Sequence, residues 1–165
     1  MVDLVWGADR PQRPLNVAKV HTVEFAGRST LDKYDDLVKD LEGTDYLLVT
    51  ALDEIAWMLN LRGSDISFNP VFFSYLLIDV AEKSSTLFIT EEKIGSIKAY
   101  LEEIRTSVKP YDQIEAELTM LVSQGKKIAT DTAKCNSQLK GLIADNCVEK
   151  NNLIALPKSK KNETE

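Results

Sequence analysis

The apolar run Tyr46–Thr50 is the feature that most constrains how this chain folds. An unbroken apolar run is typical of a strand covered on both faces, as in parallel or mixed sheets flanked by helices. A short helix is predicted directly after it, over Leu52–Leu59. Beyond a polar segment, Val71–Val80 and Ser85–Thr90 predict two more strands, and the turn-length break Ala81–Ser84 between them indicates a hairpin.

Apolar stripes at three- and four-residue spacing predict four further helices. The first begins at Ser29, whose hydroxyl can accept from the free amides of a helix start, and it ends before Gly43. The four helices are predicted over residues 29–41, 91–106, 113–124 and 133–143. Residues 127–130 predict a short strand, residues 147–156 one or two short strands, and residues 17–25 an extended segment. This order of elements indicates an α/β domain with a mixed β-sheet flanked by helices.

Length and charge limit the class of protein. At 165 residues the chain fits one domain with a single core. No apolar run approaches the roughly 20 residues of a membrane span, and no secretory signal is readable, so we expect a cytoplasmic location. The net charge of −6 argues against a nucleic-acid partner. We interpret the basic cluster Lys158–Lys161 as a solvated tail.

Residue types that carry catalysis are sparse. His21 is the one histidine of the sequence, and no recognisable partner motif accompanies it. Cys135 and Cys147 fit neither a zinc spacing nor a redox pair, so we expect reduced, partly buried thiols, with a disulfide possible in principle. Asp53 and Glu54 would point about a third of a turn apart on a helix, so they cannot act together on one atom. We interpret them as carboxylates that favour a helix start.

Polar and aromatic side chains crowd the connection between the first two predicted strands. The candidates for a substrate-cleft or interdomain surface are Trp57, Asn60, Arg62, Asp65 and Phe72. Arg62 has two open interpretations. Its guanidinium either forms an internal ion pair, or it faces a cleft and binds a carboxylate or a peptide carbonyl. The internal partners would be Asp53, Asp65 or Asp79.

Two stretches of this region, Thr50–Asp65 and Asn69–Tyr75, closely resemble the second domain of eukaryotic-type cytosolic Xaa-Pro aminopeptidases, in the creatinase/prolidase family. Trp6–Pro14 is similar to the start of that domain. Ala155–Glu165 is similar to the segment that leads into the catalytic domain. A later motif is carried by Asp131, Cys135, Asn136 and Leu139. The resemblance implies a linker at 1–14, which contains Gly7, Pro11 and Pro14, a creatinase-like non-catalytic domain at 15–156, and a connection to a catalytic domain at 157–165.

In the family that these residues resemble, the catalytic domain removes an amino-terminal residue when proline is second, and it uses two divalent metal ions, usually manganese. No residue here matches a metal ligand or catalytic histidine of the family, so we expect no cofactor in this segment and no peptide hydrolysis by it alone. The implied partners are the catalytic domain of the same polypeptide and, in the full-length enzyme, proline-containing peptides and a second subunit. The alternative is a free-standing binding or regulatory module that uses the 60–75 surface.

Overall fold

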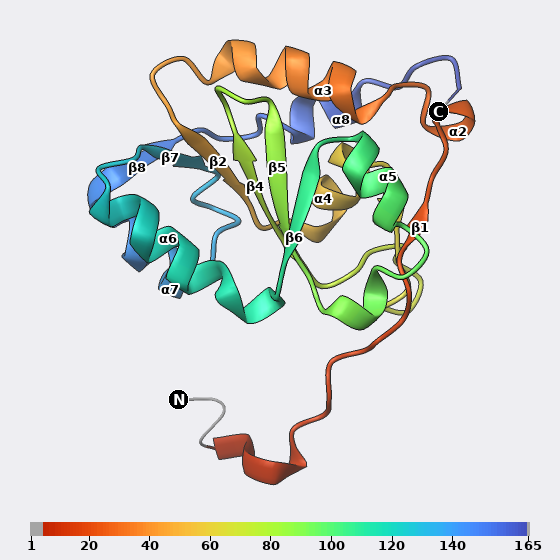
Figure 1. The fold of residues 1–165 in the computed structure, drawn as a ribbon, viewed down its shortest axis with the longest axis horizontal. Coiled ribbons are helices and arrows are strands. Elements are labelled where there is room, and N and C mark those ends of the chain that lie inside the picture. The colour runs from red at the N-terminus through yellow and green to blue at the C-terminus, as the bar shows by residue number, and fades with distance from the viewer. Residues whose placement is uncertain (1–4, 165) are drawn as a thin grey trace.

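The computed structural model describes residues 5–164, apart from the side chain of Ala8, and shows a six-stranded sheet between two layers of helices (Figure 1). The strand order is β6-β5-β4-β2-β7-β8. The strands are β2 (Tyr46–Val49), β4 (Tyr75–Asp79), β5 (Ser84–Phe88), β6 (Thr106–Lys109), β7 (Ile128–Thr130) and β8 (Cys147–Glu149). Strand β4 is antiparallel to both neighbours, and the other pairings are parallel. The predicted α/β fold with a mixed sheet is confirmed.

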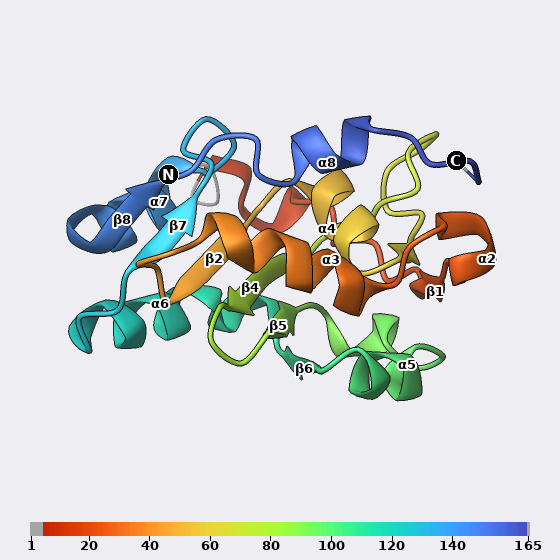
Figure 2. The same ribbon diagram turned by 90° about the horizontal axis from the view of Figure 1, so that it is seen from above.

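Helices cover both faces of the sheet, as Figure 2 shows from above. One face carries α3 (Thr30–Leu37), α4 (Leu52–Met58), α5 (Lys98–Glu103) and α8 (Ala155–Ser159), and the other carries α6 (Ile114–Ser123) and α7 (Ser137–Ile143). Successive side chains of β2 alternate between the two cores: Leu47 and Val49 pack toward the first face, and Leu48 toward the second. The central strand is therefore buried on both faces, as its continuous apolar run predicts.

The start of α3 follows the predicted capping. The Ser29 hydroxyl accepts from the backbone amide of Asp32 at 3.1 Å, which satisfies one of the free donors of the first turn. The helix continues as a 3-10 turn, η2 (Val38–Asp40), and Gly43 follows with a φ of 77°. The β4–β5 hairpin is also confirmed by its antiparallel register.

The continuous helix predicted over residues 91–106 is wrong. Glu91–Lys93 forms a 3-10 turn (η3), the helix proper is only α5, and the chain reverses at Arg105, whose φ is 54°. Residues Thr106–Lys109 then add a parallel strand, β6, beside β5. The helical spacing of Ile97, Leu101 and Ile104 is real, since all three are buried, but it extends over less than two turns.

Other boundaries differ at turns. Residues 71–74 precede β4 without joining it, and α7 begins at Ser137 because Asn136 caps it, accepting from the Leu139 amide at 2.9 Å. The segment predicted as extended holds β1 (Lys19–Val20) and α2 (Val23–Ala26). The C-terminal stretch holds one strand, β8, and then α8 instead of a second strand. Cys135 and Cys147 are free thiols, buried and half-buried as expected, and burial raises the pKa of both.

Both ends of the described chain run over the surface. Residues 10–18 are extended and reach β1, and the predicted linker 1–14 lies partly outside the described residues. At the other end, Lys158 pairs with Asp53 of α4, and Lys160 and Lys161 are exposed. The amide of Asn162 donates to the carbonyl of Ala26 at 3.3 Å, so the C-terminal segment ends beside α2 (Figures 1 and 2).

Candidate interaction surface

The segment 60–75 folds back on itself as a narrow loop at one end of the molecule. It leaves β3 (Leu61–Arg62), which pairs with β1, and then two backbone bonds tie its arms together. The amide of Gly63 donates to Pro70 and that of Asp65 to Val71, both at 3.1 Å. A Cβ at position 63 would lie 2.7 Å from the Cβ of Phe72, so only glycine allows the arms to approach this closely.

A buried ion pair fixes the base of this loop. The ammonium of Lys93, in η3, binds the carboxylate of Asp65, and both side chains are fully buried. The same carboxylate accepts from the amide of Phe73 at 2.7 Å, and the carbonyl of Lys93 accepts from the amide of Ala18 at 2.9 Å. Lys93 therefore joins the loop to the N-terminal strand segment. Buried ionic groups need such partners because their desolvation is costly.

The outer end of the loop carries apolar side chains into solvent. Phe68 is fully exposed and has a φ of 63°, and Ile66 is 39% exposed. Leu15 and Val17, on the extended segment beside the loop base, are about half exposed, and Asn16 between them donates to the carbonyl of Ser64 at 3.0 Å. We call Leu15, Val17, Ile66 and Phe68 the tip surface. Exposed apolar groups gathered in one region are typical of a surface that another structure covers.

Arg62 has a local structural role. Its guanidinium donates to the carbonyls of Ala56 and Leu61 at 3.0 and 2.9 Å. The Ala56 carbonyl belongs to the last turn of α4, where a positive charge is favourable. The carboxylates considered as its internal partners have other contacts: Asp65 binds Lys93, Asp53 binds Lys158, and Asp79 accepts from the amide of Glu82 at 2.9 Å.

The other predicted site residues divide by burial. Asn60 and Phe72 are buried, and so is the side chain of Asp65, so the structure turns these three into the domain as internal contacts. Trp57 is half-buried. Of the predicted set, Arg62 and Trp57 are the two that keep partly exposed side chains.

Two lysines, Lys33 and Lys93, are buried, and the sequence pattern does not predict the contacts that they make. Lys33 lies in α3 and is only 3% exposed, although it carries a charge. Its ammonium donates to the carbonyl of Trp57 at 2.7 Å and the side-chain oxygen of Asn60 at 2.5 Å, and it lies 4.2 Å from the centre of the Trp57 ring. Asn60 in turn donates to the carbonyl of Arg28 at 2.8 Å. Helical periodicity offers no signal for this, because a long side chain can bend inward from a polar position.

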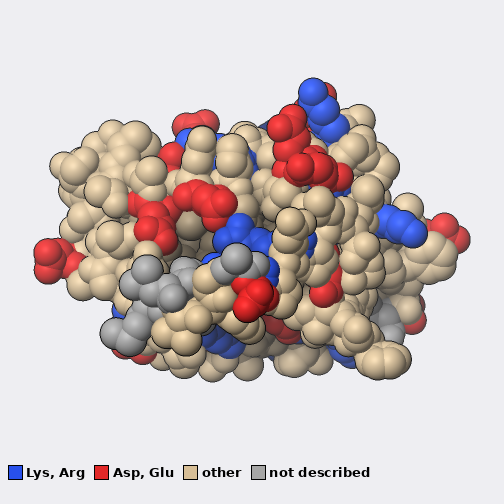
Figure 3. Space-filling model, turned by 90° about the horizontal axis from the view of Figure 1, so that it is seen from below, with Lys and Arg blue, Asp and Glu red and all other residues tan. Residues whose placement is uncertain are grey.

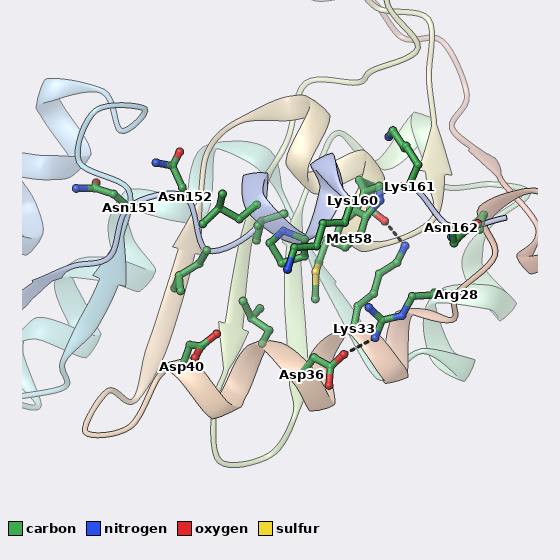
Figure 4. A pocket seen from close by; sticks show the side chains of 17 residues that line it. Arg28, Lys33, Asp36, Asp40, Met58, Asn151, Asn152, Lys160, Lys161 and Asn162 are labelled. Carbon is green, nitrogen blue, oxygen red and sulfur yellow. Dashed lines mark hydrogen bonds and ion pairs between the residues drawn. The ribbon is translucent and has the colours of Figure 1, made fainter. Parts of the chain in front are cut away.

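A cavity of about 460 Å³ lies between α3, the end of α4 and the C-terminal segment 151–162 (Figure 4). Its apolar lining includes Leu37, Met58 and Ile154. Basic residues line both sides: Arg28 and Lys33 lie in or next to α3, and Lys160 and Lys161 lie in the C-terminal segment, with the Lys161 side chain directed away from α3 (Figure 4). The acidic lining residues are Asp36, which pairs with Arg28 at 2.5 Å, and Asp40.

A second cluster holds the N-terminal segment against the sheet edge where β6 ends. Arg13 lies 4.2 Å from the centre of the Tyr111 ring and pairs with Asp112 at 3.0 Å. The rings of Tyr111 and Tyr75 are 5.0 Å apart, and burial raises the pKa of Tyr111. These contacts of Arg13 give the extended segment a fixed path across the fold. On the surface seen from below, acidic and basic side chains are interspersed (Figure 3).

Residues 5–164 lack two features that would indicate other kinds of function. No group of three or more His, Cys, Asp or Glu side chains is placed to hold a metal ion. Within the same residues, no helix has the length and apolar character required to cross a bilayer.

Comparison with known proteins links the chain to one peptidase group. The Creatinase/Prolidase N-terminal domain family matches residues 9–165. A probable Xaa-Pro aminopeptidase P of Aspergillus niger is 43% identical over 136 residues, which are 81% of this chain and 22% of the relative. One of Paracoccidioides brasiliensis is 49% identical over 117 residues, 69% of this chain and 18% of the relative. The chain spans about a fifth of the length of these curated relatives.

Solved structures share the fold. The X-prolyl aminopeptidase of Caenorhabditis elegans, described as a cytosolic enzyme with a di-nuclear active site, matches 99% of this chain and 28% of its own, with a TM-score of 0.89 and 26% identity. The Xaa-Pro dipeptidase of Bacillus anthracis matches 83% of this chain and 38% of its own, with a TM-score of 0.60 and 12% identity. The second match is a likeness of fold alone.

Proposed function

The chain belongs to the Creatinase/Prolidase N-terminal domain family, and on that premise we propose that it is a non-catalytic domain of an Xaa-Pro aminopeptidase. The parent enzyme would remove the amino-terminal residue from peptides with proline second. Its two divalent metal ions, manganese by our expectation, would lie in the catalytic domain, in keeping with the di-nuclear site of the nematode enzyme. We expect the parent to be cytoplasmic and homodimeric through that domain.

We further propose that the tip surface packs against the catalytic domain and limits access of peptides to the active site. The observation that carries this proposal is the exposure of Phe68 on a loop whose base is rigidly anchored. Most of the length of the relatives lies outside the region matched here.

Replacing Phe68 with serine tests this packing. In the 165-residue chain the side chain is fully exposed, so the free energy of unfolding should change by less than about 0.5 kcal/mol. In the full-length enzyme the same change should remove about 1.5–3 kcal/mol of domain packing, since a buried phenylalanine is lost. Urea unfolding of both proteins, with kcat/KM for a proline-second peptide, measures the two effects.

The matched control is Met120→Ser, which removes an apolar side chain that is 43% exposed on α6, away from the tip surface. Because that side chain is partly buried within the domain, its loss of stability should be the same in the 165-residue chain and in the full-length enzyme, and the kinetics should not change. If Phe68→Ser and Met120→Ser behave alike in the full-length enzyme, the tip surface is not an interdomain contact.

Arg62 provides a separate test of access to the cleft. We propose that its partly exposed guanidinium faces the catalytic domain while it caps α4. Arg62→Ala in the full-length enzyme should raise KM or lower kcat/KM, because a planar donor for peptide carbonyls is removed. Arg62→Lys keeps the positive charge but loses the planar pair of N–H donors, so its kcat/KM should lie between those of the wild type and Arg62→Ala. Wild-type kinetics of Arg62→Ala at normal stability would restrict this residue to capping the helix.

A further inference from the structure

The cavity beside α3 combines an apolar interior with basic groups at its mouth, and no step of the proposed function uses it. Leu37, Met58 and Ile154 line its base but are at most 6% exposed. The apolar lining residues more open to the space are Trp57 and Leu153, both half-buried, and Leu156, which is 63% exposed. Its volume of about 460 Å³ lies within the range of about 300–1,000 Å³ that is usual for small-molecule sites. The space thus suits a small ligand with an apolar body.

The charges around the cavity differ from those of the whole chain. Four basic residues and two acidic residues line it, whereas the chain as a whole carries a net charge of −6. The basic lining residues are Arg28, Lys33, Lys160 and Lys161. Lys33 is almost fully buried, and hydrogen bonds to Trp57 and Asn60 hold its ammonium in place. The positive charge of Lys33 adds to the field at the cavity wall, because a charge in a low-dielectric region is only weakly screened.

The mouth of the cavity is formed by two more basic residues on a different element. Lys160 and Lys161 are exposed and belong to the C-terminal segment, across the cavity from α3 (Figure 4). Lys161 donates to the carbonyl of Lys158 at 3.1 Å, which holds it near the segment. Because the basic groups come from two elements, a ligand between them would contact both.

We propose that this cavity binds a small organic monoanion: a carboxylate attached to an apolar body of the size of an N-acylated amino acid. The carboxylate lies toward the lysines, and the apolar body packs on Trp57, Leu153 and Leu156. Asp36 and Asp40 also line the cavity, and their carboxylates would repel each further negative charge on a ligand. A multiply charged ligand such as a nucleotide is therefore disfavoured. The inference does not depend on the identity of the parent enzyme.

A titration of the 165-residue chain with N-acetyl-L-leucine, followed by two-dimensional amide NMR, tests the proposal. We expect saturable shifts confined to α3, the end of α4 and residues 151–162, with a Kd of about 1 mM. N-acetyl-L-leucinamide has the same body without the charge, and it should bind about tenfold more weakly, since charge-assisted hydrogen bonds are lost. Equal binding of acid and amide, or shifts scattered over the surface, would overturn the proposal.

Charge reversal at the mouth supplies the matched variants. Lys160→Glu/Lys161→Glu changes two exposed side chains, so folding should be retained, and the Kd of the acid should rise about tenfold while that of the amide stays the same. Lys98→Glu/Lys140→Glu makes the same change in net charge at exposed positions outside the cavity and should leave both constants unchanged. An equal loss of acid binding in the two double variants would mean a general charge effect and no site. Absence of saturable binding up to about 20 mM would also refute the inference.

Discussion

Replacing Lys93 with methionine is expected to lower the free energy of unfolding by about 3–5 kcal/mol, because it leaves the Asp65 carboxylate buried without its counter-charge. One oxygen of that carboxylate, Oδ1, already lacks a hydrogen-bond donor within the described part of the chain. The other would keep only the amide of Phe73. Urea unfolding of the 165-residue chain measures the loss, and the loop around Phe68 should become more sensitive to chymotrypsin.

The control is the double variant Lys93→Met/Asp65→Asn, which removes both charges together and keeps a side-chain oxygen as acceptor for the Phe73 amide. Its stability should return to within about 1 kcal/mol of the original chain, since no unpaired charge is left buried. The difference between the single and the double variant separates the buried charge from the change in packing. If both variants lose the same stability, packing of the lysine stem, and not the ion pair, anchors the loop.

Phe72→Ala is expected to destabilise the chain by about 3–5 kcal/mol, the usual result of removing a core phenylalanine. The Phe72 side chain has no exposed surface, and it packs where Gly63 allows the two arms of the loop to meet. Phe72→Leu retains most of the buried apolar area, so its loss should be only about 1–2 kcal/mol. Thermal and urea unfolding monitored by tryptophan fluorescence give both values.

The loss of stability of Phe72→Ala, compared with its change in kcat/KM, would distinguish a core residue from a residue that binds substrate. A phenylalanine that served a cleft could be truncated with little loss of stability and a large loss of kcat/KM. Here the order should be the reverse in the full-length enzyme: kinetics of the protein that remains folded should change less than stability. A Phe72→Ala variant of normal stability with a lowered kcat/KM would instead indicate that Phe72 contacts the substrate.

The sequence predicted elements well where local signals and burial agree. The β2 run is apolar because both of its faces are covered, and the Ser29 cap forms because the first turn of α3 has no other acceptor for the Asp32 amide. Strand β6 was missed because Thr106–Lys109 is half polar and follows a helical stripe. Its strand geometry comes from pairing with β5, which no local pattern records.

The candidate site was harder to predict than the fold. The 60–75 segment does hold an exposed loop, but Asn60 and Asp65 are polar because they satisfy two buried lysines. From sequence alone, a polar residue among aromatics has the same signature whether it faces a ligand or a buried ammonium. The position of Phe68 at the exposed end depends on the anchoring of Asp65 by Lys93, a contact between residues 28 positions apart.

The parallel pairing of β2 with β7 also has a consequence for the order of folding during synthesis. Leu48 lies opposite Thr130, 82 residues later, whereas the β4–β5 hairpin joins neighbours in the chain. Contacts between distant residues form late because closing a long loop costs more entropy. While the ribosome is still making residues 50–127, one edge of β2 has no strand beside it, and its amides and carbonyls are open to pairing with other chains. Pairing with β7, once it has emerged from the ribosome, ends that exposure.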